Sequence, residues 1–468
     1  MKRATKIFGN MKSYKEDYFM KEKLSFQQNL LIGSLLFGLF FGAGNLIFPV
    51  QMGQEAGRNT LIATIGFLIT GVGLPMVGIV ASALSKSESL FDMARPISSR
   101  YASIFTCLLY LTIGPLFAIP RTATVAFEVG IHPFISDEYL KLGLFVFSLI
   151  FFTFTIYFSL RPGRILDWVG KYLTPIFLAL LSILLIATFL KPMGQVDQYV
   201  AQGNYATQPL FTGLLDGYNT MDALASLAFA IIIISNIQKL GVKNSRLIAK
   251  ETCKSGLVSV AFMTIIYGSL AYMGATSLGS VSRADNGGSI LAMVSNHYFG
   301  MIGTVLLAAI VGIACSKTAI GLITSCSEMF SEMFPKSLSY KKYAIIFTVF
   351  SFIIANFGLS NIIQLSIPVL MFLYPLAITL ILLSLLTPII NKQSDVYKWT
   401  TGFTIIAAFF DLCKSLPKNF QENFVVAKIV DFAHLYLPGF DYGFGWILPA
   451  FCGFFIGVII WRINSKKA

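Results

Sequence analysis

The sequence has 468 residues, of which 56% are hydrophobic and only 12% are charged, and its formal net charge is +13. A soluble domain would carry about 25% charged residues, so the composition excludes a soluble globular chain and predicts an all-α, polytopic membrane protein. The positive charge does not indicate nucleic-acid binding, because the basic residues cluster beside the predicted membrane spans.

The chain begins with a polar, lysine-rich segment at residues 1–25. This segment lacks a short apolar core followed by a cleavage site, so no signal peptide is expected. We expect a cytoplasmic tail with an affinity for anionic lipid.

Twelve apolar runs follow, and they predict about twelve transmembrane helices, each of which needs about 20 residues. Both termini are predicted to be cytoplasmic, because 26 of the 35 lysines and arginines then fall on the cytoplasmic side and seven outside. The other two, Arg121 and Lys317, lie within spans. The runs are near 26–54, 60–84, 101–127, 139–160, 166–190, 209–238, 252–278, 299–327, 343–359, 362–387, 397–416 and 443–462.

The first run contains FGLFFGAGNLIFPVQMGQEAG, which places Gly42 to Asn45 at its middle and Pro49 one turn later. Backbone groups freed from a helix in hydrocarbon cost several kcal/mol unless they face a cavity or a solute. We therefore predict a helix that breaks at mid-membrane, as in the binding sites of secondary transporters. The alternative is close helix packing through Gly38 and Gly42, which leaves Asn45 and Pro49 unexplained.

The sixth run also holds polar residues in an apolar stretch, namely Asn219, Thr220, Asp222 and Ser226. We expect this helix to unwind around Ala225 to Ala230. The alternative is an unbroken amphipathic helix that turns one face to a channel or a neighbouring helix.

Two interrupted spans, five helices apart and opposite in topology, predict a 5+5 inverted repeat. We expect a single transmembrane domain over 26–463, with repeats at about 26–190 and 209–387. The last two helices, at about 397–463, are an addition to the repeats.

Four segments resemble the branched-chain amino acid carriers of the BrnQ type: FFGAGNLIFPVQMGQEAG, IGPLFAIPRTATVAFE (113–128), GYNTMDALASLAF (217–229) and IIQLSIPVLMFLYP (362–375). The resemblance covers about 25–462. It implies a symporter in the bacterial inner membrane for leucine, isoleucine and valine, driven by a proton or sodium gradient. This family is similar to the LeuT-fold superfamily, in which helices 1 and 6 are unwound near mid-membrane.

On that comparison, Gly42 to Asn45 and Ser226 to Ala230 fall on the two unwound segments. The predicted substrate-binding residues are Gly42, Ala43, Gly44, Asn45, Ser226 and Phe229. N–H groups at the start of a half-helix suit the substrate carboxylate, and glycines allow close approach. Phe229 is the candidate for the apolar side-chain pocket, although an aromatic residue in a chain with 43 phenylalanines is also compatible with a core position.

Arg121 and Asp222 are both predicted to lie in the outer half of the membrane, where a lone charge is costly and is usually paired. One interpretation is an outer gate that closes over the substrate as an ion pair. The other is a static buried pair.

Lys317 lies in the eighth run, GIACSKTAIGLITS, where the resembling family usually has an apolar or hydroxyl-bearing residue. The LeuT-like fold places a sodium site here, which implies Thr318 and the carbonyls of Gly38 and Phe41 as its donors. The Lys317 ammonium is predicted to replace the cation, because like charges repel strongly at low dielectric. It could then release and rebind a proton during transport. The alternative is an amine that snorkels or pairs elsewhere.

The sequence contains no H-E-x-x-H, no G-x-S-x-G and no P-loop, so we predict neither an enzyme nor an ATP-driven pump. The six cysteines form no C-x-x-C pair, and we expect no metal and no cofactor. We expect the protein to be embedded in the lipid bilayer and to need no obligatory protein partner. The alternative functions are a cation channel, since glycine-rich breaks also line selectivity filters, and a carrier for other small apolar amino acids with different coupling.

Overall fold

The computed structural model describes residues 23–465, except 86, 88, 162–165 and 285, and within these ranges the only regular elements are helices. Nearly all of the predicted cytoplasmic tail, residues 1–22, lies outside the described residues. The first half of the chain forms α1 (Phe26–Phe40), α2 (Ala43–Ala56), α3 (Thr60–Leu68), α4 (Leu74–Leu84), α5 (Leu90–Ala94), α6 (Ser99–Leu111), α7 (Ala118–Gly130), α8 (Leu140–Ser159) and α9 (Thr174–Leu190).

The second half continues the bundle and then adds a flank. It consists of α10 (Asn204–Thr207), α11 (Pro209–Asn219), α12 (Asp222–Lys239), α13 (Ser245–Ser277), α14 (Gly287–Met333), α15 (Tyr340–Ala355), α16 (Leu359–Leu385), α17 (Thr387–Ile390), α18 (Ser394–Lys414), α19 (Lys418–Gln421), α20 (Phe424–Tyr436) and α21 (Ile447–Ser465). Within the bundle, wider π-helical turns join α3 to α4 (Ile69–Gly73), follow α6 (Thr112–Leu116) and precede α9 (Leu166–Leu173).

Nine helical segments among the described residues are long and apolar enough to cross a membrane. One of them, Ala43–Leu84, runs through parts of two predicted spans, and the apolar α1 is shorter than the rest. The chain is therefore a multi-pass membrane protein, while the exact number of twelve spans stays a prediction.

Side-chain caps explain where several helices begin. Ser25 accepts a hydrogen bond from the N–H of Gln28, whose side chain in turn caps Ser25. Asn244 caps α13, and Asn286 caps α14 through the N–H of Ser289. Such caps satisfy N–H groups that have no partner within the helix.

The first predicted span is interrupted between α1 and α2, at Phe41 and Gly42. Gly42 is extended, and its N–H donates to the Asn45 side chain at 3.1 Å. The break therefore falls at the start of the predicted segment, and Ala43 to Asn45 form the first turn of α2.

The sixth predicted span is interrupted at Thr220 and Met221, so the prediction of unwinding at Ala225 to Ala230 is wrong. The Thr220 hydroxyl donates to the Gly217 carbonyl at 2.9 Å and accepts from the Asp222 N–H at 3.3 Å, which ends one helix and starts the next. The alanines that follow are good helix formers and continue α12 without a break. Met221 has a φ of +65°, a conformation that costs a non-glycine residue about 1–2 kcal/mol.

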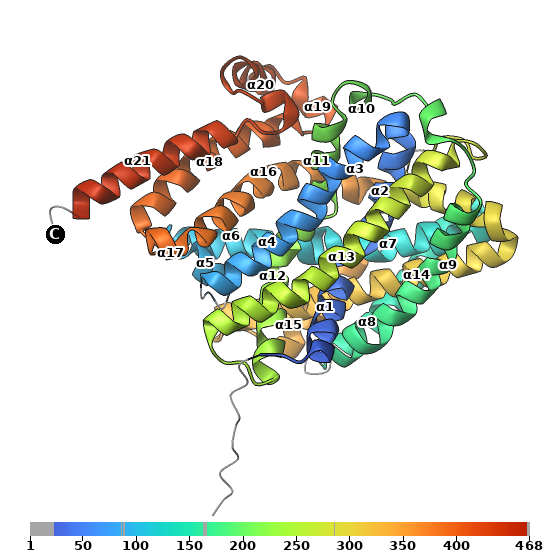
Figure 1. Cartoon of the computed structure of the whole chain (residues 1–468), viewed down its shortest axis with the longest axis horizontal. Helices are drawn as coiled ribbons and strands as arrows, with labels where there is room; N and C mark the ends of the chain where they lie inside the picture. Colours follow the sequence, from blue (N-terminus) through green and yellow to red (C-terminus); the bar gives the residue numbers. More distant parts are fainter. Residues whose placement is uncertain (1–22, 86, 88, 162–165, 285, 466–468) are drawn as a thin grey trace, which may run out of the picture.

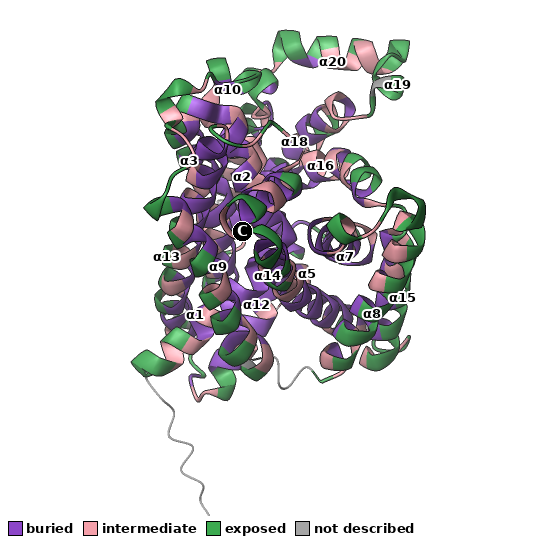
Figure 2. Ribbon diagram, turned by 90° about the vertical axis from the view of Figure 1, so that its right-hand side faces the viewer, coloured by how far each residue is buried: buried purple, intermediate pink, exposed green. Residues whose placement is uncertain are grey.

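The flank formed by α18 and α21 lies beside α16, with the C-terminus at its far end (Figure 1). These two helices correspond to the predicted additional pair. Buried residues fill the middle of the bundle, whereas exposed residues lie on its perimeter and on α20 (Figure 2). The two interruptions belong to this buried centre, since Phe41, Gly42, Thr220 and Met221 are all buried.

Candidate functional site

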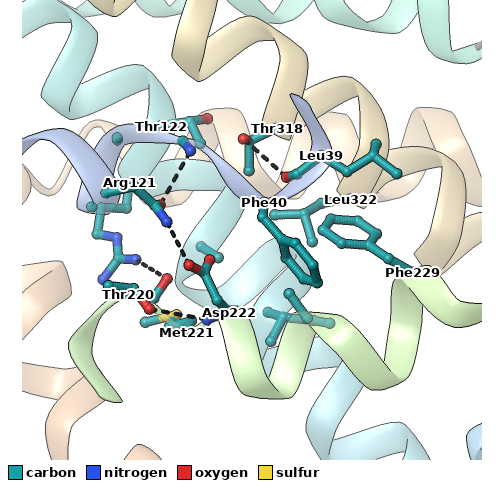
Figure 3. Close-up of a pocket in the computed structure, with 17 residues that line it drawn as sticks. Leu39, Phe40, Arg121, Thr122, Thr220, Met221, Asp222, Phe229, Thr318 and Leu322 are labelled. Carbon is teal, nitrogen blue, oxygen red and sulfur yellow. Dashed lines mark hydrogen bonds between the residues drawn. The ribbon is translucent and has the colours of Figure 1, made fainter. Parts of the chain in front are cut away.

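A small cavity of about 20 Å³ lies where the two interrupted helices meet (Figure 3). It is bounded by α1 and α2, by the start of α7, by the α11–α12 junction and by the middle of α14. Its walls are formed by Leu39, Phe40, Gly42, Ala43, Gly44, Asn45, Ile113, Ala118, Arg121, Thr122, Thr220, Met221, Asp222, Ala225, Phe229, Thr318 and Leu322.

Five of the six predicted substrate-binding residues line this cavity: Gly42, Ala43, Gly44, Asn45 and Phe229. The sixth, Ser226, does not. Its hydroxyl donates to the Ala223 carbonyl at 2.7 Å and faces Gly78 of α4. Because α12 is helical here, the Ser226 side chain packs against α4 and not into the cavity.

The start of α2 gives the cavity a polar, electropositive end. The first N–H groups of a helix have no acceptor within the helix and carry the positive end of its dipole. A Cβ on Gly42 would lie 2.7 Å from the Thr318 Oγ1 and 3.0 Å from its Cβ, and one on Gly44 would lie 3.1 Å from an Arg121 nitrogen. The absence of side chains at both positions keeps this backbone accessible.

A buried polar cluster joins the two interruptions. The Asn45 amide donates to the Asp222 carboxylate at 2.5 Å and to the Tyr267 hydroxyl oxygen. Tyr267 in turn donates to the same Asp222 oxygen at 3.1 Å. Because Asn45 also caps Gly42, it connects the break in the first span to the break in the sixth.

Arg121 and Asp222 both line the cavity, yet they form no direct ion pair among the described residues. Arg121 donates to the Thr220 carbonyl at 3.4 Å (Figure 3) and to the Asn219 carbonyl at 3.0 Å. The predicted Arg121–Asp222 pair is therefore wrong for this conformation, because carbonyls at the end of α11 take up the guanidinium and Asn45 with Tyr267 take up the carboxylate. A role of either residue in gating stays a prediction.

The opposite end of the cavity is apolar. The Phe40 and Phe229 rings meet edge to face with their centroids 5.8 Å apart (Figure 3). Ile113 and Leu322 complete this wall from two further helical segments. The cavity therefore has one electropositive end and one apolar end.

The predicted cation region is divided between two environments. Thr318 lines the cavity and donates to the Leu39 carbonyl at 3.2 Å. Gly38 instead packs against Thr174 and Val169, so it does not line the cavity.

Phe41 also lies outside the cavity wall and packs on the rings of Phe177 and Tyr267. Lys317 is fully buried, and its Nζ has no hydrogen-bond partner among the described residues. The ammonium lies 4.0 Å from the Phe177 ring centroid and 5.5 Å from that of Phe37. The expected contacts of Lys317 with the Gly38 and Phe41 carbonyls are therefore not present; aromatic faces surround the ammonium instead.

Nine lining residues were not predicted as site residues: Leu39, Phe40, Ile113, Ala118, Thr122, Thr220, Met221, Ala225 and Leu322. Leu322 follows Thr318 by four residues, a spacing that places both on one face of α14. Ile113 and Thr122 flank a third interruption at Gly114 and Pro115, for which the Gly-Pro pair was an available signal. The described residues contain no group of three His, Cys, Asp or Glu side chains placed to hold a metal ion, and the absence of a cofactor stays a prediction.

Comparison with known proteins gives one family over almost the whole chain. The sequence profile of a family described as branched-chain amino acid transport protein matches residues 25–464. The chain is 48% identical to the branched-chain amino acid permease BrnQ of Lactobacillus delbrueckii subsp. lactis over 96% of its own length and 100% of that protein. It is 40% identical to BrnQ of Bacillus subtilis, again over 96% of this chain and 100% of the relative.

Two solved structures share the fold. Mhp1, a nucleobase-cation-symport-1 family transporter in a closed conformation, superposes with a TM-score of 0.60 over 94% of this chain and 93% of its own, at 14% identity. MhsT in complex with L-phenylalanine superposes with a TM-score of 0.54 over 94% of this chain and 99% of its own, at 15% identity. The fold is therefore that of the LeuT-fold transporters.

Proposed function

The chain belongs to the family of branched-chain amino acid transport proteins, and from this premise we propose that it is a symporter that imports leucine, isoleucine and valine. The family and these relatives are transporters and not enzymes. The proposal includes a place in the bacterial cell membrane with both termini in the cytoplasm. The observation that carries it is the cavity between the two interrupted helices, which has an electropositive and an apolar end.

Because the two ends of the cavity differ in polarity, we propose one orientation of the bound substrate. The amino acid carboxylate faces the first turn of α2, beside Gly44 and Arg121. The aliphatic side chain lies against Phe40 and Phe229. The ammonium faces acceptors at the interruptions, among them the carboxylate of Asp222.

The coupling ion in this proposal is the proton, with Lys317 in the place of a sodium ion. A desolvated ammonium over an aromatic ring gains about 2 kcal/mol or more, and Lys317 lies over two such rings. A sodium ion beside a fixed ammonium would be repelled. No carboxylate forms an ion pair with Lys317 among the described residues, so neither protonation state is fixed by a counter-ion.

The test is uptake of labelled leucine into proteoliposomes, with sodium and proton gradients imposed separately. The proposal requires saturable accumulation that follows the proton gradient. A flux that does not saturate and cannot exceed equilibrium would identify the alternative, a channel.

Replacing Phe229 with alanine is expected to raise the KM for leucine by about 10- to 200-fold, because it removes contact with the apolar side chain worth about 1–3 kcal/mol. The matched control is Ser226→Ala on the same helix, which should leave the KM close to wild type. An unchanged KM in the Phe229 variant would place the aliphatic side chain elsewhere.

Replacing Lys317 with threonine is expected to abolish the response of uptake to a proton gradient, because the variant lacks the ammonium that carries the proton. The measurement compares wild type and K317T with and without sodium at neutral pH, with the neighbouring Ser316→Ala as control. If wild-type uptake requires sodium and ignores the proton gradient, the proposed role of Lys317 is wrong.

A further inference from the structure

Beyond the cavity, α14 carries a second set of polar residues. Thr324, Glu328 and Glu332 follow one another at intervals of four, which places them along one face of the helix. Glu328 lies ten residues after the cavity residue Thr318, or about 15 Å along the helix axis. The predicted topology puts this end of α14 on the cytoplasmic side.

Glu328 is a half-buried carboxylate without an ion-pair partner among the described residues. The groups that act on it electrostatically are the like-charged Glu332 and, more weakly, Lys239 at the end of α12. Tyr110 of α6 and Tyr340 of α15 also lie within its electrostatic reach. A carboxylate in a membrane-spanning segment that is not held by a cation is typically functional.

Three helices contact this part of α14: α6, α12 through the Ala228 carbonyl, and α15 through Tyr343 and Phe347. The Cys326 thiol contacts the Tyr110 carbonyl at 3.5 Å, and the sulfurs of Cys107 and Met333 are 3.8 Å apart. α6 therefore contacts α14 at Cys326 and at Met333. Glu328 lies between these two residues along α14.

Two hydroxyls buried near Glu328 have no hydrogen-bond partner of good geometry in the part of the chain that the structure describes. They are those of Tyr110, which lies beside Ser325, and Thr324, which lies beside Tyr340. A buried polar group without a partner costs about 1–3 kcal/mol. Water that reaches these hydroxyls when a carrier opens to this side would recover this cost.

We propose that Glu328 is the group through which the transported proton leaves the carrier at this end of α14, an inference that rests on the proton coupling proposed above. The Glu328 carboxylate accepts the proton that entered with the substrate and becomes a neutral carboxyl group. It then releases the proton to water on that side, which restores the carboxylate. Tyr110 and Thr324 provide the polar surroundings through which water reaches it.

The experiment separates net transport from exchange in proteoliposomes. Net accumulation requires proton release in every cycle, whereas exchange of external labelled leucine for internal leucine does not. A gradient of one pH unit supports about tenfold accumulation for one proton per substrate. We expect Glu328→Gln to lose this accumulation and to retain leucine exchange at a rate close to wild type.

Two variants control for structural effects. Glu328→Asp keeps a carboxylate and should retain most of the accumulation, while Glu332→Gln removes the exposed carboxylate one turn further and should accumulate leucine like wild type. Accumulation by E328Q at the wild-type level, or loss of exchange together with accumulation, would overturn the assignment. A wild type that does not respond to the proton gradient would instead overturn the proposed coupling itself.

Discussion

Replacing Gly42 with leucine is expected to abolish leucine uptake while the protein still inserts into the membrane. A Cβ at this position would already lie 2.7 Å from the Thr318 Oγ1 and 3.0 Å from its Cβ. Threonine is β-branched and stiff at χ1, so it cannot move aside cheaply. The larger side chain also fills the space in front of the first turn of α2, where the carboxylate is proposed to bind.

The matched control is a glycine in open space. A Cβ on Gly312 of α14 would meet nothing within 4 Å, so Gly312→Leu should insert and transport like wild type. Membrane insertion and yield are compared by immunoblot, and uptake is measured with labelled leucine. Normal transport by both variants would remove the binding site from the first interruption.

The first interruption was predictable because its signal is local. Two glycines, an asparagine and a proline stand together in an apolar run, and in the structure Gly42 is extended and capped by Asn45. The sixth span carried a similar density of polar residues, and an interruption was expected there too. The position of this interruption was predicted wrongly. The small residues around Ser226 suggested unwinding, but most of them are alanines, which are good helix formers.

The contacts between distant residues were less accessible to sequence reasoning. Both Arg121 and Asp222 were identified as buried charges near one another, and opposite charges suggested a pair. The structure instead gives each its own partners, which depend on carbonyls freed at the end of α11 and on Tyr267, 45 residues beyond Asp222. Backbone carbonyls carry no sequence signature, so this arrangement could not be predicted from residue types.

Replacing Asp222 with alanine is expected to reduce uptake by about tenfold or more and to destabilise the protein, because it strands two buried donors at about 1–3 kcal/mol each. These donors are the Asn45 amide and the Tyr267 hydroxyl. Asp222→Asn keeps an acceptor oxygen and should retain more activity. In a double-mutant cycle on the thermal stability of the purified protein, Asn45→Ala and Asp222→Ala should show a coupling of about 0.5–3 kcal/mol.

The charge exchange Arg121→Asp with Asp222→Arg supplies the decisive comparison. Position 121 faces two carbonyls and therefore needs a hydrogen-bond donor, while position 222 faces two donors and needs an acceptor. The exchange puts an acceptor against acceptors and a donor against donors, so uptake should stay as low as in the single variants. Recovery of uptake in the exchanged variant would show that Arg121 and Asp222 act on each other directly, and that the partners seen here belong to one conformation of the gate only.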